Sequence, residues 1–108
     1  MIEKTVRTLY SLLLNRQYQQ IEKMTEGIRL NSQEIEGAIS DYGRNMAPYP
    51  EHVEFDLIEI TGSNPKSWSV VAPVYTMEEG LSDLSLEMTL TQIDADLLKV
   101  ELDNIHVL

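Results

Sequence analysis

The chain has 108 residues, of which 43% are hydrophobic and 24% are charged, and its formal net charge is −10. This size and composition fit one compact domain, and the lack of cysteine excludes disulfides and thiolate metal sites. The excess of carboxylates argues against nucleic acid as a partner, because binding to phosphates needs clustered Lys and Arg, and it favours a cationic protein.

The negative charge is concentrated in the second half of the chain. Residues 1–52 contain seven Asp and Glu against six Lys and Arg, whereas residues 53–108 contain eleven against two. Apolar runs such as Leu12–Leu14 are far shorter than the roughly 20 residues of a membrane span. No apolar leader region follows Met1, so we expect a soluble cytoplasmic protein with no membrane partner.

The first half predicts two helices before residue 28. The first is indicated by apolar residues that recur at three- and four-residue steps, namely Ile2, Val6, Leu9 and Leu13. A short second helix should end at Gly27. One face of that helix would be formed by Tyr18, Ile21 and Met24 or Thr25.

A third helix has the clearest local signal. Asn31 can cap its first turn, and Glu34 stands three residues later, as a capping box requires. Gly43 is well placed to end this helix in a left-handed conformation. The following stretch, residues 46–51, holds two prolines, which exclude helix and predict an extended linker.

The second half predicts four strands in an antiparallel arrangement. A first strand over residues 53–60 changes phase, which suggests a bulge near Leu57 and Ile58. The second strand contains Pro73, which cannot donate to a ladder, so it lies at an edge or carries a bulge there. The third strand alternates cleanly from Leu84 to Thr91, and the fourth runs from Leu98 to Val107.

These elements predict an α+β fold in a single domain, residues 1–108. The helical part covers residues 1–47 and the antiparallel sheet part covers residues 53–108. We expect three N-terminal helices packed on one face of a four-stranded, mainly antiparallel sheet. Trp68 shares the phase of Val70 and Ala72, which places it toward the helices in the core.

The strand phases predict which carboxylates share a surface. If the strand sets that contain Leu84 and Val100 face the helices, five carboxylates project outward together, namely Glu54, Asp56, Glu87, Glu101 and Asp103. Tyr75 would face outward among them as an aromatic anchor for a partner. The alternative is a solvated acidic face that only keeps the protein soluble.

No motif in the sequence indicates catalysis, a cofactor or a metal. Glu78, Glu79 and Asp83 have no His, Cys, Tyr or Lys between them, so we interpret them as a loop that bonds to itself. His52 and His106 have no companion ligands at zinc-site spacing, and the Asp94–Asp96 turn lacks the ligand pattern of an EF-hand.

The most distinctive stretch is Trp68 to Leu84, which reads Trp-Ser-Val-Val-Ala-Pro-Val-Tyr-Thr-Met-Glu-Glu-Gly-Leu-Ser-Asp-Leu. It resembles the signature of an uncharacterised bacterial domain family, and the resemblance extends from about Arg29 to Leu90. That family has Arg at the position of Leu81, so no ionic role is expected there in this chain. The family carries no established activity.

In size and charge the chain is similar to immunity proteins of bacterial toxin systems, including contact-dependent growth inhibition. We therefore expect a non-enzymatic protein, a monomer or homodimer, that neutralises a cationic toxin domain, which could be a nuclease, through the acidic sheet face. The alternative is a small ligand-binding or dimeric scaffold with a pocket between helices and sheet. A third reading, an acidic-site hydrolase, requires two carboxylates to converge in a cleft.

Overall fold

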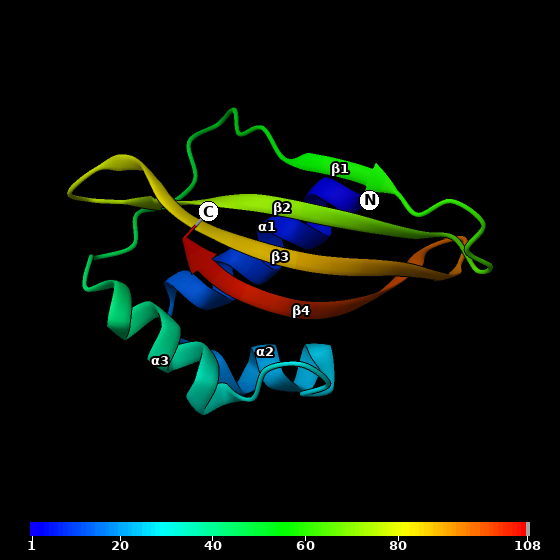
Figure 1. Cartoon of the computed structure of the whole chain (residues 1–108), viewed down its shortest axis with the longest axis horizontal. Helices are drawn as coiled ribbons and strands as arrows, with labels where there is room; N and C mark the ends of the chain where they lie inside the picture. The colour runs from blue at the N-terminus through cyan, green and yellow to red at the C-terminus, as the bar shows by residue number, and fades with distance from the viewer. Residues whose placement is uncertain (108) are drawn as a thin grey trace.

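Three helices precede four strands in the computed structural model, which describes residues 1–107 (Figure 1). The helices are α1 (Ile2–Leu14), α2 (Tyr18–Thr25) and α3 (Ser32–Tyr42). The strands are β1 (Asp56–Glu59), β2 (Ser67–Thr76), β3 (Gly80–Asp94) and β4 (Leu97–Val107). They form one antiparallel sheet in the order β1-β2-β3-β4, so the predicted α+β architecture is confirmed.

The helices cover one side of the sheet and the β4 edge. Helix α1 lies behind the sheet in Figure 1, and α2 and α3 lie beside β4. The apolar stripe of α1 is buried against the inner sides of the strands, and Val6 and Leu9 are fully buried. Alternation in β3 places every second residue from Leu84 to Leu90 in the same core. Each such side chain contributes about 1.5–3 kcal/mol through burial.

Helix α3 begins and ends as its sequence predicts. The Oδ1 atom of Asn31 accepts the N–H of Glu34 at 2.8 Å, and the Glu34 carboxylate accepts the N–H of Asn31 at 3.0 Å. Gly43 ends the helix with φ +74°, a conformation that costs little only for glycine. An N-cap of this kind contributes about 1 kcal/mol to helix stability.

Helix α1 ends in a Schellman motif that lacks the usual glycine. The N–H of Gln17 donates to the carbonyl of Leu12 at 2.8 Å, and the N–H of Arg16 donates to that of Leu13 at 3.1 Å. Arg16 has φ +59°, the left-handed region in which a side chain is unfavourable. The chain therefore places an arginine where local energetics prefer glycine.

The edge strand β1 differs from its prediction. It has four residues rather than eight, and its pairing with β2 is continuous from Asp56 to Glu59, so the bulge expected near Leu57 and Ile58 is wrong. Both of those side chains are exposed, at 48% and 67%. Leu57 and Ile58 lie on opposite faces of β1. The helices do not cover this edge strand, so neither side chain is buried.

The sequence predicts an edge or a bulge at Pro73, and the structure has a bulge there. Pairing between β2 and β3 shifts between Pro73 and Tyr75, beyond the end of β1. The hydroxyl of Ser82 closes the bulge, donating to the carbonyl of Val74 at 2.6 Å and accepting the N–H of Leu84 at 3.2 Å.

On the other edge of β2, where β1 has ended, the N–H of Tyr75 donates to the hydroxyl of Tyr10 at 3.1 Å, and that hydroxyl donates to the carbonyl of Ala47 at 2.6 Å. Burial raises the pKa of Tyr10, so the hydroxyl keeps its proton.

The linker after α3 continues the sheet where β1 ends. Met46 forms an isolated antiparallel bridge with Thr76. The N–H of Ala47 donates to the carbonyl of Tyr75, and the N–H of Met77 donates to the carbonyl of Asn45, each at 2.8 Å. The proline-containing linker is therefore extended, as predicted, and it is hydrogen-bonded to β2.

Candidate functional site

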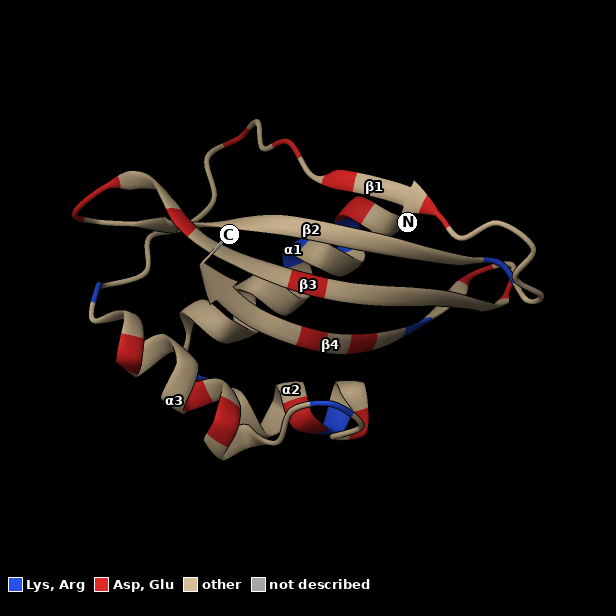
Figure 2. Cartoon of the chain, in the orientation of Figure 1, with Lys and Arg blue, Asp and Glu red and all other residues tan. Residues whose placement is uncertain are grey.

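The outer face of the sheet, opposite α1, carries the predicted carboxylates. Strand register aligns Asp56 with Val71, Val71 with Glu87, and Glu87 with Asn104 across the sheet. The neighbouring residues on β3, Leu86 and Met88, are buried, so this row faces away from the helices. Figure 2 shows acidic positions on β1, β3 and β4, with those of β3 and β4 next to each other.

One part of this face is concave. We name it the acidic hollow, and it has a volume of about 420 Å³. It is lined by His52, Glu54, Asp56, Val71, Pro73, Tyr75, Leu81 and Ser85. Glu54, Asp56 and Tyr75, three of the six predicted partner-binding residues, therefore surround one depression with an apolar floor.

Tyr75 is supported by an aromatic stack behind it. Its ring meets Tyr49 edge to face, with centroids 5.9 Å apart and planes at 87°. Tyr49 in turn stacks on Tyr10 at 3.5 Å, and its hydroxyl donates to the carbonyl of Pro73 at 2.6 Å. Burial raises the pKa of Tyr49, which keeps this donor protonated. The sheet and the linker thus fix the position of the Tyr75 ring, which forms part of the wall of the hollow.

Two carboxylates on the β3–β4 side of the face lie close to side chains of other residues. Oε2 of Glu87 lies 3.1 Å from Nε2 of His106. Oδ2 of Asp103 accepts the hydroxyl of Thr89 at 2.6 Å, and its Oδ1 lies 3.6 Å from Nε of Arg29. Sequence phase places these carboxylates correctly, but it gives no sign of partners from other elements.

The other three predicted carboxylates have no such partners. Within residues 1–107, Glu54, Asp56 and Glu101 form neither a side-chain hydrogen bond nor an ion pair. Glu54 and Asp56 are exposed, and Glu101 is partly buried beside Thr89, its cross-strand neighbour. The two exposed carboxylates without such partners therefore lie together at the acidic hollow.

The Glu78–Glu79 loop does more than bond to itself, which corrects the prediction. The carboxylate of Glu78 accepts the backbone N–H and the side-chain amide of Asn45, both at 2.9 Å. Glu79 accepts the hydroxyl of Tyr42 at 2.9 Å and that of Thr76 at 3.1 Å. The hairpin is therefore attached to the end of α3, because partners far away in sequence meet it in space.

The family described as "Domain of unknown function (DUF7668)" matches residues 10–108. The chain belongs to the DUF7668 family. The match includes the whole sheet and begins at Tyr10, the residue whose hydroxyl accepts the N–H of Tyr75 in β2. The resemblance to an uncharacterised domain family is thus confirmed. Comparisons with curated proteins and with solved structures give no match.

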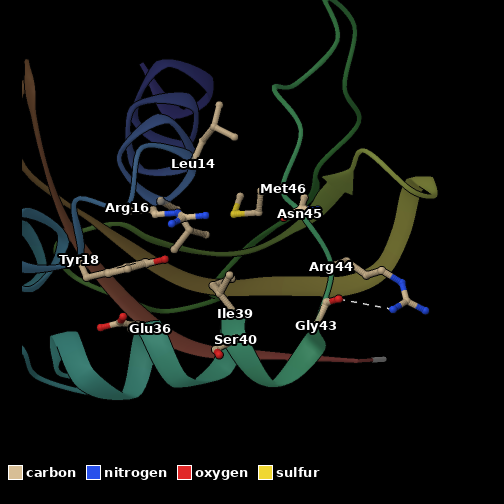
Figure 3. Close-up of a pocket in the computed structure, with 11 residues that line it drawn as sticks. Leu14, Arg16, Tyr18, Glu36, Ile39, Ser40, Gly43, Arg44, Asn45 and Met46 are labelled. Atoms are coloured by element: carbon tan, nitrogen blue, oxygen red, sulfur yellow. Dashed lines mark hydrogen bonds between the residues drawn. The ribbon is translucent and has the colours of Figure 1, made fainter.

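This DUF7668 chain has a second cavity, of about 390 Å³, at the C-terminal end of α1 (Figure 3). It lies between α1, α3 and the linker. Figure 3 shows Arg16 and Tyr18 directed toward its centre, while Arg44 points away. Neither Trp68 nor Leu84 lines it, because the first packs against the core and the second is buried within it. For the alternative of a ligand-binding scaffold, we expect a large apolar cavity lined by Trp68 and the residues that share the strand phase of Leu84.

Two further observations concern possible metal ligands and membrane-spanning helices in the DUF7668 chain. Within residues 1–107, no three His, Asp or Glu side chains are grouped as metal ligands would be. None of the helices in the same range is long and apolar enough to cross a membrane.

Proposed function

We propose that this DUF7668 chain is a non-enzymatic binding protein whose outer sheet face captures a cationic protein. We infer that the partner is a bacterial toxin domain and that the chain acts as its cytoplasmic immunity protein. Enzymes that act on nucleic acid carry basic grooves, since they must bind phosphates. An acidic face that enters such a groove competes with the substrate.

The observation that carries this proposal is the composition of the acidic hollow. Two exposed carboxylates, Glu54 and Asp56, stand beside an aromatic ring, Tyr75, over a floor that includes Val71 and Pro73. A lysine or arginine side chain fits this chemistry, because its charge meets the carboxylates and its stem meets the apolar floor. Long-range attraction by the remaining acidic surface accelerates the encounter.

The partner for the test is a basic C-terminal toxin domain, which we expect to be encoded beside this chain in its source genome. We expect titration calorimetry to measure tight binding and co-expression of this chain to restore growth of cells that produce the domain. The double reversal Glu54→Lys with Asp56→Lys should weaken binding about tenfold or more. Added salt should weaken the wild-type complex as well, through screening.

The matched control reverses two carboxylates outside the outer face, with Asp41→Lys and Asp96→Lys together. Asp41 is exposed on α3, and Asp96 lies in the β3–β4 turn, so this variant changes the net charge equally. It should retain most of the affinity. If both double variants bind equally well, or if no basic domain is encoded beside this chain, the proposal fails.

A further inference from the structure

The β1 strand presents an unpaired backbone edge. In the sheet it has a single neighbour, β2. The N–H of Ile60 donates to the carbonyl of Ser67 at 2.8 Å, which sets the alternation along the strand. In an antiparallel pair successive residues point their backbone groups to opposite sides, so Ile58 bonds to β2 and Leu57 and Glu59 point outward. Nothing within residues 1–107 pairs with these outward groups.

The side chains of this edge are apolar on both of its faces. Ile58 is 67% exposed on the outer face, and Leu57 is 48% exposed on the opposite face. Ile60, just after the strand, is 40% exposed. Exposed edges are protected by short strands, charged side chains, Pro or bulges. β1 is short and has a carboxylate at each end, but it has no Lys, Pro or bulge. At the opposite side of the sheet, α2 and α3 contact β4 (Figure 1).

Charge selects which strand the edge accepts. Asp56 and Glu59 stand at the two ends of β1, and Glu54 precedes it. A second copy of this chain would bring another net charge of −10 to the same place. An edge of four residues also falls far short of the roughly 1,200 Å² that a stable dimer buries. A cationic chain, in contrast, gains from both the backbone and the carboxylates.

We propose that β1 accepts an extended cationic segment of the partner protein as a fifth strand. This inference rests on the proposed function and supplies its binding mode. Residues directly opposite across two strands contact each other, so basic side chains belong opposite Asp56 and Glu59. Apolar side chains belong opposite Leu57 and Ile58. The segment therefore reads basic–apolar–apolar–basic in either strand direction, and its outer side chains lie beside the acidic hollow.

The first test uses a synthetic peptide, Thr-Lys-Val-Val-Lys-Thr with blocked ends, added at millimolar concentration to the 15N-labelled full chain. Backbone pairing should slow the hydrogen exchange of the Leu57 and Glu59 amides, because these N–H groups become donors to the peptide. A peptide of the same sequence with N-methyl groups on alternate amides keeps the charge but cannot complete the ladder. It should give no protection.

Variants test the same edge in the chain itself. Leu57→Pro removes one outward N–H and leaves the bonds to β2 intact, a position at which proline is tolerated. It should weaken peptide binding about tenfold, the equivalent of one hydrogen bond near the upper end of its usual range. Leu57→Ala keeps the N–H and should cost less. Glu59→Pro provides a second removal of an outward donor if the first variant does not fold.

The outcomes separate this inference from the proposed function. If the methylated peptide binds as well as the parent, or if Leu57→Pro and Glu59→Pro change nothing, strand addition is wrong. The same is true if no amide is protected, or if Leu57 and Glu59 are protected without peptide as protein concentration rises, which indicates a second copy. In each of these cases the Glu54 and Asp56 charge reversals, measured with the toxin domain, still test separately whether the acidic hollow binds that domain.

Discussion

The carboxylate of Glu78 accepts two hydrogen bonds from Asn45, one from its backbone N–H and one from its side-chain amide, each 2.9 Å long. This contact attaches the β2–β3 hairpin to the segment that follows α3. The adjacent bond from Tyr42 to Glu79 reinforces it. The hairpin and the helical part are thereby joined at the end of the sheet near the acidic hollow, since Leu81 follows this loop and lines the hollow.

Replacing Glu78 with Gln should destabilise the protein at neutral pH and much less in acid. The hydrogen bond from the Asn45 N–H lowers the pKa of Glu78 below its ordinary value of 4.5. A depressed carboxyl pKa adds stability above the unfolded-state pKa, and that contribution is lost as pH falls through the folded-state value. Urea midpoints of wild type and variant should therefore converge between pH 7 and pH 3. Asp83→Asn is the control, because the Asp83 side chain is exposed and has no hydrogen bond within residues 1–107, and it should leave the urea midpoint at pH 7 unchanged.

Tyr10→Phe should cost about 1–3 kcal/mol of unfolding free energy, because it leaves the buried N–H of Tyr75 without an acceptor. The Tyr10 side chain is 2% exposed, so water cannot readily replace the hydroxyl. Denaturant unfolding measures the difference. Tyr42→Phe removes a more exposed hydroxyl that bonds to Glu79 and should cost less. Equal costs would show that the N–H of Tyr75 does not depend on Tyr10 as its acceptor.

Arg16→Gly should raise the unfolding free energy by about 0.5–1 kcal/mol, because glycine adopts the left-handed conformation without steric penalty. The φ of Arg16 is +59°. The matched control is Gln17→Gly at the next position, where φ is −88° and glycine brings only an entropic cost. Thermal or denaturant unfolding should move in opposite directions for the two variants. A loss of stability in Arg16→Gly would mean that its side chain makes compensating contacts.

Tyr75→Ala should weaken binding of the proposed toxin domain about tenfold or more, as loss of a central aromatic contact commonly does. Tyr75 lines the acidic hollow and rests against Tyr49. Calorimetry measures the affinity, and unfolding of the free variant shows whether the fold persists. Tyr18→Ala, an equal truncation at the second cavity, should leave binding unchanged. Similar losses from both would place the partner elsewhere.

Much of the fold follows from local patterns. Asn31 and Gly43 are the two caps of α3. Each interacts with residues within one turn of the helix end, so the local sequence is enough to predict both. The alternation from Leu84 to Leu90 likewise requires only one buried face. Pro73 predicts an irregularity wherever its strand lies. These features depend on neighbours a few residues away, and the structure confirms them.

The site was predictable only in part. Strand phase correctly indicates that Asp56, Glu87 and Tyr75 face away from the helices. It cannot show that Glu87 meets His106, or that Tyr75 rests on Tyr49, because those contacts depend on register and on the path of the linker. The error at Leu57 and Ile58 has a similar origin, since sequence does not reveal that the helices leave the β1 edge uncovered.

The sequence by itself determined the elements, the antiparallel class of the sheet and the acidity of its outer face. Each of these properties arises from side chains spaced at short, regular intervals. Only the tertiary structure decided which carboxylates stay unpaired, where the outer face becomes concave and which strand edge stays open. Those properties arise where residues such as Asn45 and Glu78 meet across more than thirty positions of chain.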